Sequence, residues 1–218
     1  MLEEITCPIC RALMQQEYGC IKPAKCYDDC LRKCYGCQLG ASNTQKNPTF
    51  IYRNFLDAIP IQVREGLEDV LDNALNVANR ATKKRRIAYS SSEDAATWVF
   101  FSYFVIYRKL DVLQQLLGLS ESIVEILLWG CPLIEKEDKS YTSLLISTCT
   151  SLNEYDTFFT EPDCVIILAK SVVFIEVKRS SMHAIESDAS KFERYYDARY
   201  YIDYQSAIHS RLYELVRN

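Results

Sequence analysis

The stretch "EPDCVIILAKSVVFIEVK", residues 161–178, decides the fold expected for the second half of the chain. Its apolar runs, CVIILA and VVFIEV, are typical of buried strands, and Lys170-Ser171 between them is typical of a short turn. Charged residues stand at the ends of these runs: Asp163, Glu176 and Lys178. Because residues two apart on a strand share a face and a hairpin brings its ends together, we expect these side chains to meet at one end of a sheet.

Two carboxylates and an ammonium at one sheet end are costly to bury unless they coordinate something. Carboxylate oxygens suit Mg²⁺ or Mn²⁺, which keep several waters and share phosphate oxygens. A nearby lysine can orient a metal-bound water, and the metal can stabilise charge on a phosphate in the transition state. The pattern indicates a metal-dependent active site. The alternative is two ordinary core strands with solvated charges at their ends.

Pro162-Asp163, followed after twelve residues by Glu176-Val177-Lys178, resembles the signature of the PD-(D/E)XK, or restriction-endonuclease-like, nuclease superfamily. The resemblance implies that Asp163 and Glu176 bind the metal together with the backbone carbonyl of Val177. It also implies that Lys178 helps to activate the attacking water.

The resemblance extends over about Ser90 to Tyr204, the length of a core with the order helix, three strands, helix, strand. In this family a leading helix often supplies one more acidic residue, for which Glu93 is the first candidate and Asp94 the second. Some members carry a glutamine and a tyrosine four apart on the helix after the lysine. This chain has Lys191 and Tyr195 at that spacing, and Lys191 is a candidate phosphate contact.

The resemblance implies a Mg²⁺- or Mn²⁺-dependent nuclease that hydrolyses DNA phosphodiester bonds, of endonuclease type. One site cuts one strand, so a homodimer is a candidate assembly for double-strand cleavage. Two alternatives stay open. In the first, the fold serves as a non-catalytic nucleic-acid-binding or adaptor protein; the complete acidic pair with its lysine counts against this alternative. In the second, the enzyme acts on RNA.

Seven of the ten cysteines lie between Cys7 and Cys37, and they include two C-x-x-C pairs separated by 23 residues. Such pairs resemble the knuckles of zinc-ribbon proteins and predict a tetrahedral Zn²⁺ site made by Cys7, Cys10, Cys34 and Cys37. Four thiolates leave no open position, so the site is expected to be structural. A second zinc ion or an iron–sulfur cluster is the alternative raised by the remaining three, Cys20, Cys26 and Cys30.

The other elements follow from periodicity and from turn residues. We expect a linker at Gln38–Pro48, an amphipathic helix at Ile61–Ala81, and a helix capped by Ser92 that stops at Gly118. Further expected elements are a helix at 121–129, strands at 141–148, 154–159 and 200–204, and helices at 186–199 and 205–218.

The sequence thus predicts an α/β fold with a mixed sheet flanked by helices and a small N-terminal cysteine-rich module. The expected segments are 1–48 for the zinc-binding module and linker, 49–89 for a helical connection, and 90–218 for the nuclease core.

Basic residues are candidate nucleic-acid contacts, although the net charge of −4 argues against a strongly basic coat protein. The run Lys83, Lys84, Arg85, Arg86 can grip phosphates near the scissile bond, or it is a solvated loop or a nuclear-localisation-like run. In the cysteine module a nucleic-acid backbone can be faced by Lys22, Lys25, Arg32 and Lys33, or the module is a protein-docking knob.

No apolar run approaches the roughly 20 residues that span a bilayer, and the start "MLEEITCPIC" is polar and acidic. We therefore expect no membrane association and no secretion signal. The expected location is intracellular, either cytoplasmic or, in a eukaryote, nuclear. Cysteines in such a reducing compartment are metal ligands or core residues rather than disulfides.

Overall fold

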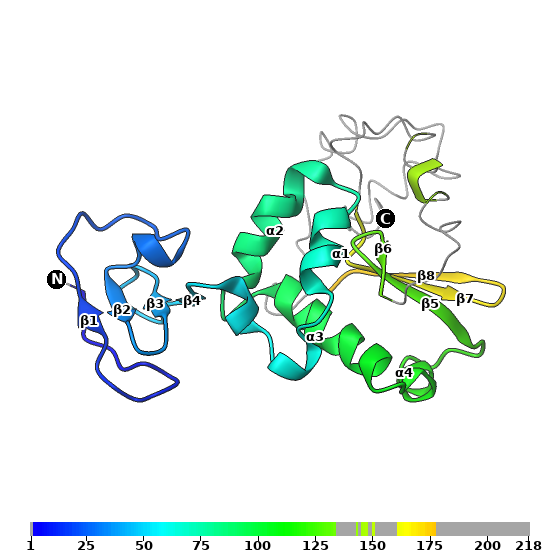
Figure 1. Ribbon diagram of the computed structural model, residues 1–218, viewed down its shortest axis with the longest axis horizontal. Coiled ribbons are helices and arrows are strands. Elements are labelled where there is room, and N and C mark those ends of the chain that lie inside the picture. The colour runs from blue at the N-terminus through cyan, green and yellow to red at the C-terminus, as the bar shows by residue number, and fades with distance from the viewer. Residues whose placement is uncertain (1, 134–142, 144, 148–149, 151–160, 178–218) are drawn as a thin grey trace, which may run out of the picture. The chain divides into compact units, whose positions relative to one another are not determined.

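The computed structural model describes residues 2–133, 143, 145–147, 150 and 161–177. The chain forms two compact units, whose helices and strands are labelled in Figure 1. The first comprises Met1–Leu67 and Ala81–Tyr103, and the second comprises Glu68–Arg80 and Phe104–Asn218. The boundaries of these units differ from those of the three segments expected from sequence. The expected middle segment, 49–89, is divided between the two units.

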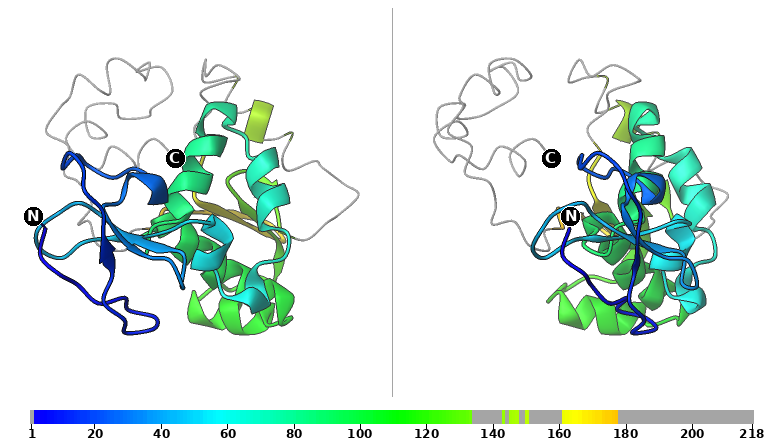
Figure 2. Two further views of the ribbon diagram at one scale, coloured as in Figure 1. Left: turned by 60° about the vertical axis from the view of Figure 1, so that its left-hand side comes forward. Right: turned by 90° about the vertical axis from the view of Figure 1, so that its left-hand side faces the viewer.

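The first unit contains a small antiparallel sheet in the order β1-β2-β3-β4. Irregular loops join the first strand to the second and the third to the fourth, and a tight turn joins the second to the third (Figure 2). The strands are β1 (Gln15–Gln16), β2 (Arg32–Cys34), β3 (Leu39–Ala41) and β4 (Phe50–Tyr52). Strand β3 lies inside the predicted linker, so that prediction was wrong: Leu39 and Ala41 are fully buried and pack beside Cys7 and Met14.

The same unit includes the segment after helix α2 (Arg80–Ile87), which is joined to β4 by backbone hydrogen bonds. The amide of Tyr52 donates to the carbonyl of Ala88 over 2.9 Å, and that of Ser90 donates to Phe50 over 2.8 Å. The basic run therefore lies on a helix of the cysteine module's own unit, and not in a loop.

Helix α3 (Glu93–Ile106) begins where the sequence predicted, because the Ser92 hydroxyl accepts the amide of Ala95 over 3.0 Å. The expected stop at Gly118 is also confirmed, by a left-handed φ of 65°. The prediction of one continuous helix between these two points was wrong. The helix breaks after Ile106, where Arg108 has a φ of 53°, and α4 (Leu110–Leu116) follows.

The predicted helix Ile61–Ala81 is likewise interrupted, by Gly66 at a φ of 79° and again after Asn73. At the second break the guanidinium of Arg80 donates to the carbonyl of Ala74 over 3.0 and 3.2 Å and so satisfies a backbone group that the helix leaves unpaired. The resulting pieces are η3 (Ile61–Val63), α1 (Leu67–Asn73) and η4 (Val77–Asn79).

The second unit is organised around a sheet in the order β6-β5-β7-β8 (Figure 1). Its strands are β5 (Ile123–Leu128), β6 (Cys131–Pro132), β7 (Cys164–Leu168) and β8 (Val172–Ile175). All described pairings are antiparallel. The fold is thus α/β as predicted, and the strand expected at 200–204, which a mixed sheet would need, lies outside the described residues.

Two element predictions in this unit were wrong. Strand β5 occupies the range predicted as a helix at 121–129, because pairing with β7 and burial of Ile126, Leu127 and Leu128 outweigh the helix propensity of leucine and glutamate. The expected strand at 141–148 is helical at its described positions, 143 and 145–147. The elements expected at 154–159 and beyond 178 lie outside the described residues.

Candidate metal centres

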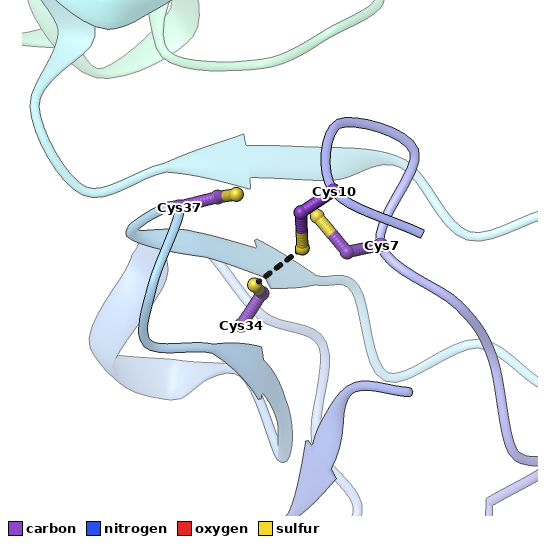
Figure 3. A group of neighbouring side chains, drawn as sticks. All are labelled: Cys7, Cys10, Cys34 and Cys37. Carbon is purple, nitrogen blue, oxygen red and sulfur yellow. Dashed lines mark hydrogen bonds between the residues drawn. The ribbon is translucent and has the colours of Figure 1, made fainter. Parts of the chain in front are cut away.

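Four cysteines of the first unit point their sulfur atoms at one another (Figure 3). The sulfurs of Cys7, Cys10, Cys34 and Cys37 all lie within 4.8 Å of one another, and those of Cys10 and Cys34 are 3.6 Å apart. A tetrahedral zinc with bonds of about 2.3 Å would hold its sulfurs about 3.8 Å apart. The four thiols therefore have the identity and spacing to bind a metal ion such as Zn²⁺.

Two tight turns build this cysteine cage. In the first, the amide of Arg11, at a φ of 65°, donates to the carbonyl of Cys7, and the amide of Cys7 donates to that of Ala12. In the second, Cys34 pairs with Leu39 across the β2–β3 hairpin, so that Cys37 lies in its turn. Each C-x-x-C pair thus folds locally, and the sheet brings the two pairs together.

The thiols of the cage differ in acidity. A backbone hydrogen bond from Ala12, followed by bonds from the thiols of Cys37 and Cys34, lowers the pKa of the Cys10 thiol to about 7. The pKa of the Cys37 thiol is raised to about 12, first by its hydrogen bond with Cys10 and then by burial. A metal needs all four as thiolates, so its binding releases protons and favours higher pH.

The remaining N-terminal cysteines do not join the cage. Cys20 is exposed, and Cys30 is buried, with its thiol 3.4 Å from the carbonyl of Cys26. Burial raises the pKa of Cys30 to about 12, which keeps it a neutral thiol. Within the described residues, the cage is the one group of three or more histidine, cysteine or acidic side chains close enough to share a metal.

Arg32 and Lys33 were expected to be able to face a nucleic acid, and the structure contradicts this. Arg32 is buried, and its guanidinium donates to the carbonyls of Glu3, Ser42 and Thr44 over 2.7 to 2.9 Å. Lys33 is buried and pairs with Glu17 over 2.9 Å. Both cations hold the module together, while Lys22 and Lys25 are exposed.

The second unit brings two of the predicted acidic residues together. Strand β8 pairs with β7 as far as Cys164 and Ile175, so Asp163 and Glu176 are the next residues of the two strands at the open end of the hairpin. Both carboxylates are half-buried, and the amide of Val177 donates to Asp163 Oδ2 over 2.9 Å. The predicted hairpin, with these two residues at its open end, is confirmed.

The chemistry of this pair fits a hard divalent cation. Mg²⁺ binds carboxylate and backbone carbonyl oxygens. Here Asp163 and Glu176 directly follow the paired residues at the open end of the hairpin, and the amide of Val177 donates to Asp163. Cys164, beside Asp163, is fully buried, which raises the pKa of its thiol, so it is suited neither as a nucleophile nor as a ligand at neutral pH.

Side chains that the sequence did not single out hold the Asp163 segment in place. Glu161 accepts the amide of Asn76 over 3.0 Å, and the carbonyl of Asp163 accepts the amide of Trp129 over 3.4 Å. At the other end of the hairpin, Glu121 accepts the amide of Lys170 over 2.6 Å. Adjacency to Pro162 was the one available signal for Glu161, and no local signal pointed to Glu121.

Glu93 and Asp94 both lie in the first turn of α3. Asp94 pairs with Lys83 over 3.3 Å, and both side chains are about nine-tenths buried, with 12% and 11% exposed. That ion pair commits Asp94 and Lys83 to joining α2 and α3. Lys83 is therefore a poor phosphate contact, whereas Arg85 and Arg86 are exposed and Lys84 is half-buried. Glu93 belongs to the first unit, so its part in the acidic site stays a prediction.

Lys178 and Lys191 lie outside the described residues, so their predicted roles also stay predictions. No described helix is long and apolar enough to cross a membrane.

Comparisons with known proteins identify no relative. No protein-family model matches the sequence, no curated protein is significantly similar to it, and no solved structure matches it significantly. Any assignment of function therefore depends on the residues and geometry of the two candidate centres.

Proposed function

We propose that the protein is a Mg²⁺- or Mn²⁺-dependent nuclease that hydrolyses DNA phosphodiester bonds on a restriction-endonuclease-like core. The position of Asp163 and Glu176 at the open end of the β7–β8 hairpin, next to the last paired residues, carries this proposal. Like charges close together at a sheet end repel each other, and a bound cation would relieve that repulsion.

In this proposal the carboxylates of Asp163 and Glu176, with the carbonyl of Val177, hold the catalytic cation. The bond from the Val177 amide orients the Asp163 carboxylate toward the end of β8. Lys178 follows directly in the chain and positions the attacking water, and Glu93 assists. A bound divalent cation supplies charge stabilisation for the phosphate and makes its water more acidic.

The cysteine cage supports this function from the first unit. Four thiolates around Zn²⁺ would complete its coordination, so the role of the cage is to hold the module in shape rather than to react. The exposed residues Arg85 and Arg86 of α2 and the half-buried Lys84 contact DNA phosphates, as does Lys191. Cleavage of both strands is performed by a homodimer.

The test is cleavage of supercoiled plasmid by the full chain with added Mg²⁺ or Mn²⁺. We expect nicking or linearisation that falls at least a hundredfold in Asp163→Asn, Glu176→Gln and Lys178→Ala, because each removes a ligand or the group that positions the water. Glu68→Gln is the matched control, because Glu68 is an exposed acid in the first turn of α1.

The outcome that contradicts the proposal is cleavage that survives in all three variants, or that falls equally in Glu68→Gln. The same assay with single-stranded RNA decides between DNA and RNA as substrate. Circular dichroism of each variant shows whether lost activity reflects lost folding.

A non-catalytic nucleic-acid-binding or adaptor protein is the second candidate. The observation that favours it is the complete cysteine cage, which is independent of the acidic pair. Binding of DNA with no cleavage under any divalent metal would support this candidate over the nuclease.

A further inference from the structure

Two basic segments far apart in the sequence border the same region of the first unit. Lys22 and Lys25 lie in the loop after β1, and Arg85 lies on α2. Tyr89, just after α2, donates its hydroxyl to the carbonyl of Lys25, 64 residues earlier in the chain, over 2.7 Å. Tyr89 also forms an isolated antiparallel bridge with Ile51 of β4. The end of α2 and the lysine loop are therefore held together.

A cavity of about 360 Å³ opens beside this junction. Its wall combines flat or apolar side chains with hydroxyl groups, and Lys22 lines it as well; the lining includes Pro23, Thr44, Thr49, Ile51 and Tyr89. Volumes of about 300 to 1,000 Å³ with this mixture of apolar wall and few polar groups are typical of small-ligand sites.

Lys22 is the charged residue of the cavity lining, and Lys25 follows it three residues later in the same loop. Lys22, Lys25 and Arg85 are exposed. The amide of Tyr89 donates to the carbonyl of Arg86 over 3.0 Å, so a tight turn joins Tyr89 to the end of α2 that carries Arg85. The neighbouring acid, Asp29, accepts the backbone amides of Lys25 and Cys26 over 2.9 and 3.2 Å, so its carboxylate is engaged by the loop itself.

We propose that this cavity holds one base of a single-stranded polynucleotide while Lys22, Lys25 and Arg85 bind the flanking phosphates. Cations that follow a backbone, combined with an aromatic or apolar seat for a base, are how proteins bind single strands without reading their sequence. The choice of a polynucleotide rests on the proposed nuclease function. An acidic peptide is the competing occupant, and the experiment separates the two.

The first experiment measures binding of a fluorescent oligothymidylate to the full chain over a series of salt concentrations, without added Mg²⁺ or Mn²⁺. Each phosphate contact in a single strand contributes about 0.7 to the slope of log K against log salt. We expect Lys22→Gln and Arg85→Gln each to lower that slope by about 0.7. Lys170→Gln, in the β7–β8 turn of the second unit, is the matched control and should leave it unchanged.

The second experiment tests the base itself. An abasic strand of the same length should bind roughly tenfold more weakly than oligothymidylate, and Thr44→Trp, which fills the mouth of the cavity, should abolish that difference. Thr44 is exposed, and its backbone carbonyl, which the variant keeps, accepts a hydrogen bond from Arg32. The variant loses the 3.2 Å bond between the Thr44 and Ser42 hydroxyls, but it keeps the module folded.

Equal slopes in Lys22→Gln, Arg85→Gln and wild type would overturn the phosphate contacts, and equal affinity for the abasic strand would overturn the base seat. Binding of acidic peptide but of no polynucleotide would also overturn the proposal. Plasmid cleavage is measured on the same variants. Loss of cleavage in Asp163→Asn with intact binding supports both proposals. Cleavage by the wild-type chain, together with unaltered salt slopes in Lys22→Gln and Arg85→Gln, would remove only the binding proposal.

Discussion

The cysteine cage and the acidic pair are both candidate metal centres, but they are built over different distances in the chain. Each half of the cage is a turn of four residues, and a short hairpin holds Cys34 and Cys37. The acidic pair depends instead on the register of β7 against β8, and that hairpin is held by Glu121, 49 residues before Lys170. Each half of the cage is therefore a local motif that the first sheet joins to the other half, whereas the acidic pair depends on the register of one hairpin.

This difference predicts how each centre fails. A metal bound by four thiolates supplies much of the folding free energy of a small module, because the module has little apolar core of its own. The sheet of the second unit has such a core, in which Ile126, Leu128, Val165 and Ile166 are almost fully buried. Loss of metal should therefore unfold the cysteine cage but leave intact the sheet that carries the acidic pair.

The largest expected effect comes from removing the metal of the cage, by chelation or by Cys34→Ser. Structural zinc contributes on the order of 10 kcal/mol to the stability of small zinc modules. We expect backbone amides of β2 and β3 to lose their protection from hydrogen exchange, while amides of β5 and β7 keep theirs. Exchange measured by mass spectrometry on the full chain reads both sheets in one experiment.

Cys20→Ser is the control for this experiment, since Cys20 is exposed and outside the cage. It should leave the metal content unchanged. Loss of metal in Cys20→Ser would contradict a four-cysteine site and would support the alternative of a second zinc ion or an iron–sulfur cluster. Equal loss of protection in β7 after chelation would contradict the separation of the two centres.

A smaller effect is expected at Gly40 in the middle of β3. A Cβ atom there would lie 2.6 Å from the sulfur and 2.8 Å from the Cβ of Cys30. Gly40→Ala should lower the free energy of unfolding of the metal-loaded module by about 1 to 3 kcal/mol through overpacking. Urea denaturation followed by hydrogen exchange of the β2–β3 amides measures this change.

Gly36→Ala is a close control, because Gly36 lies between two ligands of the cage and a Cβ there meets nothing within 4 Å. Its effect should stay within about 0.5 kcal/mol. If Gly36→Ala cost as much as Gly40→Ala, the stability of the module would depend on its turns rather than on the packing of Cys30 against β3.

The same contrast explains which parts of the fold could be predicted from sequence. Short-range signals were reliable: the two C-x-x-C turns, the Ser92 cap, the Gly118 stop and the Lys170-Ser171 turn are all present. Each of these depends on residues a few positions apart, where local chemistry determines the backbone.

Predictions that depended on distant partners were less reliable. The segment Ile123–Leu128 has the composition of a helix but forms a strand, because β7 pairs with it from about forty residues away. Lys33 and Lys83 looked like free cations, yet Glu17 and Asp94 pair with them. A basic residue in a sequence shows no partner, so charge alone could not separate structural cations from phosphate contacts.

The smallest expected effect tests the register on which the acidic pair depends. Glu121 accepts the amide of Lys170 over 2.6 Å and the hydroxyl of Ser171 over 3.0 Å, and it thereby closes the turn of the β7–β8 hairpin. Glu121→Gln removes the charge from both bonds and turns an amide donor toward one of its partners. We expect a loss of about 1 kcal/mol, measured by urea denaturation and by faster exchange of the β8 amides.

Ser171→Ala sharpens this test, because it removes one of the two bonds and leaves the other intact. Its effect should be about half that of Glu121→Gln, and both variants should reduce plasmid cleavage far less than Asp163→Asn. A shift of one residue would move Glu176 to the opposite face of the sheet. If Glu121→Gln instead abolished cleavage without lowering stability, Glu121 would have to act in the reaction rather than on the register.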